Sequence, residues 1–520
     1  MPTLLAQVPD PDGALNYLER YVRAGGGAND DGSQRALRYI DRNPATLHYL
    51  LLVFSYSRFL SETLVQQPAL AEWLHRPSRT RNFRGGIERV KSDEDLEEEF
   101  ARFEATALDA QADANTVSLR STDPPQKWRP EGRRYMEASR VLARFKRREY
   151  LRIMLRDVLG LATLADTTYE ISQLADVLLR RALRISEQRL ESAYGAPQFT
   201  DEAGRTERAS ITVLSLGKLG AQELNFASDI DLIFLYDREG ETAGDGTQMK
   251  AQAGKPEPQG GETNGGAHGA ITNQEYFIRL THALMRMISE PTPEGAVFRV
   301  DLRLRPQGAE GFVAMSIPAA LHYYRTHARE WELQMLIKAR PSAGNVEAGR
   351  RFLRELHPLV FRPEFNLGAV EAVLNAREEM TRSLARGWSG RRKAAATLAE
   401  PQADRAATWN VKLSPGGLRD IEFLTQCLQR VYGGADPWLS SPVAASTLVA
   451  LQRLHDKGHL SGRDFFRLSS AYQFLRRVEH RLQLRDGLQR HTLPGRDAPP
   501  PGPLERLARR CGVEAPPGQA

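Results

Sequence analysis

Two aspartates separated by one residue, Asp229 and Asp231, carry the strongest chemical signal in this 520-residue sequence. They flank the start of an apolar run, Ile230 to Tyr236, that has the length of a buried strand. Side chains alternate between the faces of a strand, so both carboxylates are expected to project to the same side. Two such carboxylates repel each other and are costly to bury, and a divalent cation relieves both effects. Because Mg²⁺ commonly takes one or two carboxylates together with phosphate oxygens, the pair predicts a phosphoryl-transfer site.

A glycine-bracketed turn precedes this strand. Gly217-Lys218-Leu219-Gly220 follows a second apolar run, Ile211 to Leu216, which also predicts a buried strand. Backbone N–H groups in such a turn can hold phosphate oxygens, and Lys218 and Ser228 could add donors.

A third carboxylate comes from a later segment, Ala296–Arg305, in which apolar and charged residues alternate. This pattern predicts an amphipathic strand whose polar face carries Asp301 among arginines. Taken alone, that face would be an exposed edge with cross-strand ion pairs. Beside an aspartate pair and a glycine turn, it favours a site in which three carboxylates hold two metal ions, which clamp the attacking and leaving oxygens at phosphorus.

Four segments together resemble a known family. They are GKLGAQELNFASDIDLIFLYD, VDLRLRPQGAEG, WELQMLIKAR and KLSPGGLRDIEF. Their order resembles that of the bifunctional glutamine-synthetase adenylyltransferase/adenylyl-removing enzymes, whose catalytic unit has the polymerase-beta-like nucleotidyltransferase fold. The sequence Glu223-Leu224-Asn225, followed by Ser228–Asp231, is similar to the N-terminal, adenylyl-removing half of that family. We expect the chain to correspond to this half alone, as a fragment or as a truncated gene product.

The resemblance implies a reaction, its cofactor and its partners. The reaction is phosphorolysis of adenylyl-tyrosine on glutamine synthetase, which gives ADP and the unmodified enzyme and so regulates nitrogen assimilation. The expected cofactor is Mg²⁺, as two ions. The expected partners are glutamine synthetase, the PII signal protein, ADP or ATP, and phosphate. Two alternatives stay open: ATP-dependent adenylylation of the same tyrosine, and a non-catalytic scaffold that binds glutamine synthetase or PII.

The resemblance also assigns residues. The metal-binding and catalytic carboxylates are Asp229, Asp231 and Asp301. The nucleotide- or phosphate-binding residues are Gly217, Lys218, Ser228, Arg303 and Arg305, with Lys338 and Arg340 as weaker candidates. For Arg419, Asp420 and Glu422, helix packing or an interdomain contact competes with a role in chemistry.

The predicted fold class is α+β, a mostly helical chain around a small mixed sheet. We expect a helical region at 1–195, a nucleotidyltransferase domain at 196–343 with a disordered insertion at 238–270, a helical bundle at 344–495 and a flexible tail at 496–520. The basic stretch Arg144–Arg156 predicts a solvent-exposed helix face in preference to a nucleic-acid or phosphoprotein contact.

The composition limits the class of protein. Hydrophobic residues make up 41% of the chain, enough for packed cores, and a net charge of +6 is small for its length. The small net charge disfavours nucleic-acid binding, and the lack of a long apolar run argues against a membrane span. With only Cys427 and Cys511, the chain has neither a disulfide framework nor a thiolate metal site. No signal-peptide pattern occurs at the N-terminus, and a cytoplasmic enzyme is expected.

Overall fold

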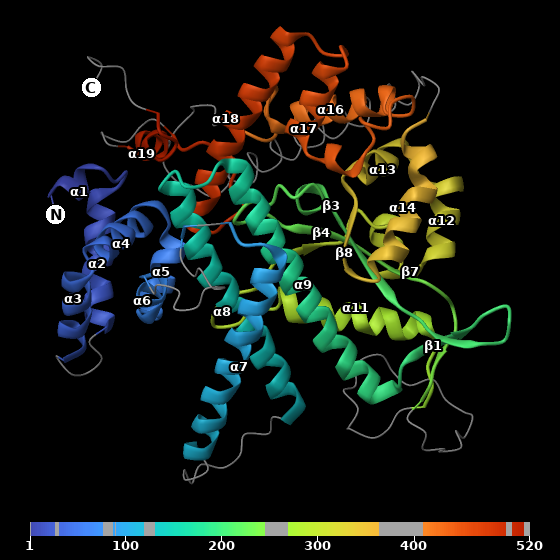
Figure 1. Cartoon of the computed structure of the whole chain (residues 1–520), viewed down its shortest axis with the longest axis horizontal. Helices are drawn as coiled ribbons and strands as arrows, with labels where there is room; N and C mark the ends of the chain where they lie inside the picture. Colours follow the sequence, from blue (N-terminus) through green and yellow to red (C-terminus); the bar gives the residue numbers. More distant parts are fainter. Residues whose placement is uncertain are drawn as a thin grey trace, which may run out of the picture.

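The computed structural model describes residues 2–25, 31–75, 87–88, 90–118, 130–244, 269–362, 409–495 and 502–513. Among them, a mixed β-sheet lies at the centre of a mostly helical chain, with helices on both of its faces and a further group of helices beyond one end (Figure 1). This arrangement confirms the α+β class.

The helices before the sheet fall into a short group and a long group. The short helices are α1 (Pro2–Ala6), α2 (Pro11–Gly25), α3 (Asp31–Arg42), α4 (Pro44–Tyr56), α5 (Arg58–Gln66) and α6 (Ala69–His75). The long ones are α7 (Asp93–Ser118), α8 (Pro130–Val158) and α9 (Leu164–Tyr194). A capping box formed by Thr163 and Asp166 begins α9, which satisfies backbone N–H groups of its first turn.

The central sheet has the strand order β6-β4-β3-β8, and β7 also pairs with β4. Its strands are β3 (Ile211–Leu216), β4 (Ile230–Tyr236), β6 (Val300–Asp301), β7 (Ala314–Ser316) and β8 (Arg340–Gly344). β3 and β4 are antiparallel, whereas β6 and β7 run parallel to β4. A second, smaller sheet has the order β2-β1-β5, with β1 (Pro197–Thr200), β2 (Thr206–Arg208) and β5 (Glu241–Thr242).

Alternate side chains of β3 and β4 enter two different hydrophobic cores. Val213 and Phe234 join a core formed with α8, α9 and α11 (Asn273–Ser289), whereas Leu214 and Ile233 join one formed with α12 (Ile317–Thr326) and α14 (Val346–Val360). The domain boundaries expected at 195 and 343 stay a prediction. The N-terminal helices share a hydrophobic core with the sheet. Helix α14, which was expected to belong to the helical bundle at 344–495, packs on the other face of the sheet.

The C-terminal helices form a third core of their own. They are α16 (Leu418–Tyr432), α17 (Thr447–Asp456), α18 (Gly462–Asp486) and α19 (Pro503–Arg510). Short elements complete the described chain: α10 (Gly217–Gly220), α13 (Glu330–Met335), η1 (Gly308–Glu310), η2 (Leu336–Lys338) and η3 (Pro442–Ala445). None of the described helices combines the length and apolarity that a membrane span needs.

Three local expectations were wrong in part. The strand expected over Ala296–Arg305 is limited to β6, because only Val300 and Asp301 pair with β4. The tail at 496–520 was expected to be flexible, but it contains α19, whose Leu507 is buried in the third core. At the start of the expected disordered insertion, β5 pairs with β1. Residues 245–268 of the insertion lie outside the described chain.

The basic stretch of α8 is not the exposed face that we expected. Arg152 is fully buried, and its guanidinium binds Glu149 at 2.8 Å and Glu170 at 2.9 Å. Lys91 is buried with them, with its Nζ 2.7 Å from Glu99 and 2.9 Å from Glu149. The pattern of α8 alone could not reveal this network, since its carboxylates come from α7 and α9 as well as from α8 itself.

Candidate functional site

The predicted carboxylates come together where β4 begins. Asp231 lies in register with Asp301 on the parallel strand β6, so the two side chains are neighbours on the same face of the sheet. Asp229 precedes the first residue of β4 by one position. The structure thus places the three aspartates in one group, although β6 is much shorter than predicted.

Two arginines neutralise the outer carboxylates. Arg299 Nε donates to Asp229 Oδ1 at 2.6 Å, and Arg303 binds Asp301 with an Nη2–Oδ2 distance of 2.5 Å. Among the described residues, no three His, Cys, Asp or Glu side chains are arranged to hold a metal ion as they stand. The oxygens of Asp229 and Asp301 are engaged by guanidinium groups that themselves lie towards solvent, with 49% and 84% of the Arg299 and Arg303 side chains exposed.

Asp231 has no such arginine partner among the described residues, and it differs electrostatically from its neighbours. Burial, followed by the negative charge of Asp301, raises the pKa of Asp231 to about 6. In contrast, the hydrogen bonds from Arg303 lower the pKa of Asp301. A half-buried carboxylate that is destabilised by its carboxylate neighbours is a position where a bound cation would be favoured.

Gly217 shapes the turn beside Asp231. Its φ of +55° is the left-handed conformation that glycine adopts without strain. A Cβ atom at this position would overlap Asp231 Oδ2. The glycine therefore lets the backbone of α10 approach the carboxylate of Asp231 closely.

Lys218, predicted as a phosphate donor, is held by a residue far along the chain. Its Nζ lies 2.7 Å from Oε1 of Glu479, a fully buried residue of α18. Burial lowers the pKa of Lys218 to about 8, against the opposing effect of Glu479. Although burial alone would raise the pKa of Glu479, Lys218 and Arg476 hold it well below its ordinary value. In this structure Lys218 joins the turn to α18.

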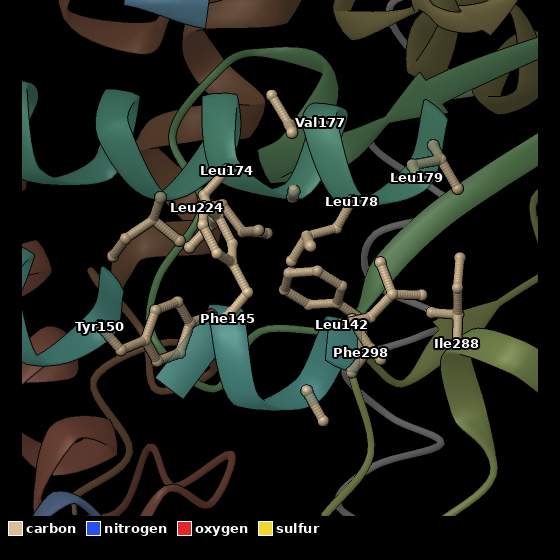
Figure 2. Close-up of a cluster of buried hydrophobic side chains, with 14 of the residues drawn as sticks. Leu142, Phe145, Tyr150, Leu174, Val177, Leu178, Leu179, Leu224, Ile288 and Phe298 are labelled. Carbon is tan, nitrogen blue, oxygen red and sulfur yellow. The ribbon is translucent and has the colours of Figure 1, made fainter. Parts of the chain in front are cut away.

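The Glu223-Leu224-Asn225 segment connects three parts of the fold. Leu224 is fully buried and lies in the cluster between α8 and α9 (Figure 2). Glu223 Oε1 accepts hydrogen bonds from Ser446 Oγ at 2.9 Å and from the backbone N–H of Thr447 at 3.0 Å, where α17 begins. Asn225 donates to Glu479 Oε2 at 2.8 Å. The segment therefore joins the C-terminal helices to the Gly217–Gly220 turn.

The remaining basic candidates mainly bind protein groups. Arg305 donates to the carbonyl oxygens of Leu302, Ala309 and Gly311. Arg340 binds Asp176 with an Nη1–Oδ2 distance of 2.7 Å and also donates to carbonyl oxygens of α10. Lys338 is buried between α17 and Glu223.

Ser228 and the KLSPGGLRDIEF candidates occupy different surroundings. The Ser228 hydroxyl is buried next to Asp229 and has no hydrogen-bond partner in the described chain, so it is suited to meet a ligand. Glu422 accepts from Tyr472 of α18 at 3.2 Å, and Asp420 accepts from the backbone N–H of Gly416 at 2.9 Å. These contacts serve packing between α16 and α18 and the geometry of the loop. Burial lowers the pKa of Arg419.

Sequence reasoning missed three residues near the site. Arg299 could have been chosen, since it occupies the same face of the alternating pattern as Asp301. Glu479 carries no local signal, because nothing in α18 indicates that it reaches the turn 261 residues away. Lys412, in the KLSPGG loop, has a positive charge that acts on Asp231 and on Glu479.

Comparisons with known proteins agree with the sequence motifs. The family model described as glutamate-ammonia ligase adenylyltransferase matches residues 109–254 and 257–355, which include all three aspartates. A second model, described as GlnD PII-uridylyltransferase, matches residues 391–520.

Curated relatives carry the name bifunctional glutamine synthetase adenylyltransferase/adenylyl-removing enzyme. The one from Nitrosococcus oceani is 38% identical over 68% of this chain and 32% of its own length. The one from Thioalkalivibrio sulfidiphilus is 37% identical over 69% of this chain and 32% of its own length. The one from Nitrosomonas europaea is 32% identical over 85% of this chain and 39% of its own length. The chain thus spans about a third of the length of the curated relatives it matches.

Proposed function

Because the chain belongs to the glutamate-ammonia ligase adenylyltransferase family, we propose that it removes adenylyl groups from a tyrosine of glutamine synthetase by phosphorolysis. The observation that carries this proposal is the group of Asp229, Asp231 and Asp301, in which Asp231 and Asp301 are paired in register and Gly217 lies against Asp231. The direction of the reaction is supported by the Glu223-Leu224-Asn225 sequence, which is similar to the adenylyl-removing half of the family.

The three aspartates would hold two Mg²⁺ ions. The donor set fits these ions, because it consists of carboxylate oxygens and Mg²⁺ prefers oxygen ligands. The raised pKa of Asp231 and the unpartnered hydroxyl of Ser228 support a site that is completed by a ligand. When bound, the ions would supply positive charge that neutralises phosphoryl oxygens.

Loading the site would require the two arginines to exchange partners. Arg299 and Arg303 would release Asp229 and Asp301, and their exposed side chains could then turn to the phosphate groups of the substrates. A guanidinium group matches phosphate as well as carboxylate geometry, so phosphate oxygens could take the place of the carboxylate oxygens that the two arginines release. Arg303 keeps the phosphate-binding role that the sequence suggested, whereas Arg305 would position the loop after β6.

The proposed chemistry forms one bond and breaks one. An oxygen of inorganic phosphate attacks the α-phosphorus of adenylyl-tyrosine, and the bond between that phosphorus and the tyrosine oxygen breaks. The tyrosine oxygen takes up a proton, and the products are ADP and unmodified glutamine synthetase. The chain would contribute positioning and charge neutralisation, which dominate phosphoryl-transfer catalysis.

Asp229→Asn tests whether the chain is an enzyme or a scaffold. We expect the rate of ADP release from adenylylated glutamine synthetase to fall by about a hundredfold to a thousandfold in the variant, because a charged metal-binding carboxylate is lost. The variant should bind glutamine synthetase like the unmodified chain in a pull-down. An unchanged rate of ADP release would exclude a catalytic role for these carboxylates. If the unmodified chain released no ADP but consumed ATP while modifying glutamine synthetase, the forward adenylylation would be the function.

Gly217→Ala is expected to lower the same rate by about a hundredfold, because the new Cβ would displace the carboxylate of Asp231 from its position. Gly204→Ala is a matched control. Gly204 has a φ of +76°, but nothing lies within 4 Å of its Cβ position. Both variants carry the same kind of backbone strain, so equal rates in the two would contradict the contact with Asp231 as the cause.

Two further expectations rest on resemblance. We propose that a PII signal protein binds the chain or its longer relatives as a regulator and that the reaction takes place in the cytoplasm. Binding of purified PII to the chain, measured by calorimetry, would test the first, and cell fractionation would test the second.

A further inference from the structure

Lys412 extends from a firmly held loop. The backbone N–H of Val411 donates to the carbonyl oxygen of His491 at 2.8 Å, and Asn410 Oδ1 accepts from the N–H groups of Lys412 and Leu413 at 3.0 and 2.9 Å. Val411 itself is fully buried in the third core. Gly417 closes the loop so tightly that a Cβ there would lie 2.9 Å from the carbonyl oxygen of Val411. The backbone that carries Lys412 is therefore rigidly positioned.

A chain of contacts leads from this loop to the carboxylates. His491 Nδ1 lies 3.1 Å from Glu479 Oε1, and that carboxylate binds Lys218 at 2.7 Å. Lys218 follows Gly217, which lies directly against Asp231. The positive charge of Lys412 also acts electrostatically on both Asp231 and Glu479. Lys412 therefore lies close to the metal-binding group, on the side of the C-terminal helices.

The other cations around the site already have protein partners. Lys218 binds Glu479, Arg299 binds Asp229, and Arg303 binds Asp301. Lys412 is half-buried, and its ammonium group makes no hydrogen bond or ion pair with any described residue. The ammonium group of Lys412 thus lies near the three aspartates without a partner among the described residues, and it is available for an anionic substrate.

We propose that Lys412 binds the attacking inorganic phosphate and holds it beside the metal-binding carboxylates, an inference that rests on the proposed phosphorolysis. A phosphate dianion is repelled as it approaches three aspartates, even when metal ions offset part of their charge. A lysine ammonium is a compact charge with three donors and is well suited to phosphate. Lys218, the sequence-based candidate for this role, is already neutralised by Glu479.

Steady-state kinetics with adenylylated glutamine synthetase, Mg²⁺ and varied inorganic phosphate test the role of Lys412. For Lys412→Met we expect the KM for phosphate to rise about tenfold to a hundredfold, the range for a lost charged hydrogen bond, while the KM for adenylylated glutamine synthetase stays unchanged. Lys412→Arg should recover most of the loss. Lys457→Met is the matched control, since Lys457 follows α17 and pairs with Asp436 away from the site. An unchanged KM for phosphate in Lys412→Met and in a second variant, Lys412→Gln, would overturn the proposal.

A binding measurement separates this proposal from the proposed function. With Mg²⁺ present, inorganic phosphate alone should raise the melting temperature of the unmodified chain and of Lys457→Met, but not that of Lys412→Met. If the wild-type chain released no ADP, the proposed phosphorolysis would be contradicted. The shift in melting temperature would still show whether Lys412 binds phosphate. Equal shifts in all three proteins would contradict phosphate binding by Lys412, whatever the activity.

Discussion

Asp231→Asn is expected to stabilise the metal-free protein while abolishing its turnover. Burial and the charge of Asp301 raise the pKa of Asp231 from 3.8 to about 6. Because the folded-state pKa lies above the unfolded one, the folded protein binds the proton more tightly, and the ionised carboxylate opposes folding at neutral pH. The two-unit difference corresponds to at most about 3 kcal/mol at pH 7, and solvent access to the half-buried group reduces it.

This penalty depends on pH in a defined direction. It is fully present above the folded-state pKa of about 6 and fades as the pH falls towards the unfolded value of 3.8. The gap in unfolding free energy between Asp231→Asn and the unmodified protein should therefore shrink to under about 1 kcal/mol near pH 4. Denaturant titrations in EDTA at several pH values measure it.

Asp229→Asn provides the comparison for Asp231→Asn. Asp229 is paired with Arg299, so its replacement should abolish turnover without stabilising the protein. Destabilisation by Asp231→Asn at pH 7 without metal would contradict the electrostatic interpretation of the site.

Glu479→Gln is expected to destabilise the protein by about 3–5 kcal/mol, the usual cost of breaking a buried ion pair from one side. Glu479 Oε1 binds Lys218 at 2.7 Å, and its Oε2 lies 2.6 Å from Arg476, which is also buried. The neutral amide would leave both cations buried without their counter-charge. Denaturant midpoints of the unmodified protein and of the variant measure the loss.

Two controls sharpen the test of Glu479. Glu19→Gln removes the same charge from an ion pair with Arg23 whose side chains are 58% and 77% exposed, and it should cost less than about 1 kcal/mol. Adding Lys218→Met to Glu479→Gln should recover part of the stability, because it removes one of the unpaired cations. A loss from Glu479→Gln as small as that from Glu19→Gln would show that α18 is not joined to the turn by this charge.

Local sequence patterns predicted the two central strands and the positions of the three aspartates relative to them. The apolar runs gave β3 and β4, the spacing of Asp229 and Asp231 placed both at the start of β4, and the alternation near Asp301 placed it on a neighbouring strand. These predictions succeed because strand periodicity and turn chemistry are properties of a few adjacent residues.

Long-range pairing was outside the reach of such patterns. Nothing near Lys218 indicates that Glu479 neutralises it, and nothing in α8 indicates that its arginines are buried against carboxylates of other helices. The length of β6 was overestimated for the same reason. It depends on how many residues of β4 are available for pairing, and β7 pairs with the later part of β4. The helix α19 was missed because prolines and arginines surround the few apolar side chains, such as Leu507, that it buries.

Incubation of the chain with adenylylated glutamine synthetase, Mg²⁺ and radiolabelled inorganic phosphate tests the proposed reaction most directly. With the wild-type chain we expect the label to appear in the β-phosphate of ADP. With the Asp231→Asn variant we expect no labelled ADP. Release of unlabelled AMP, or no release of nucleotide from the adenylylated enzyme, would contradict phosphorolysis at the Asp229, Asp231 and Asp301 site.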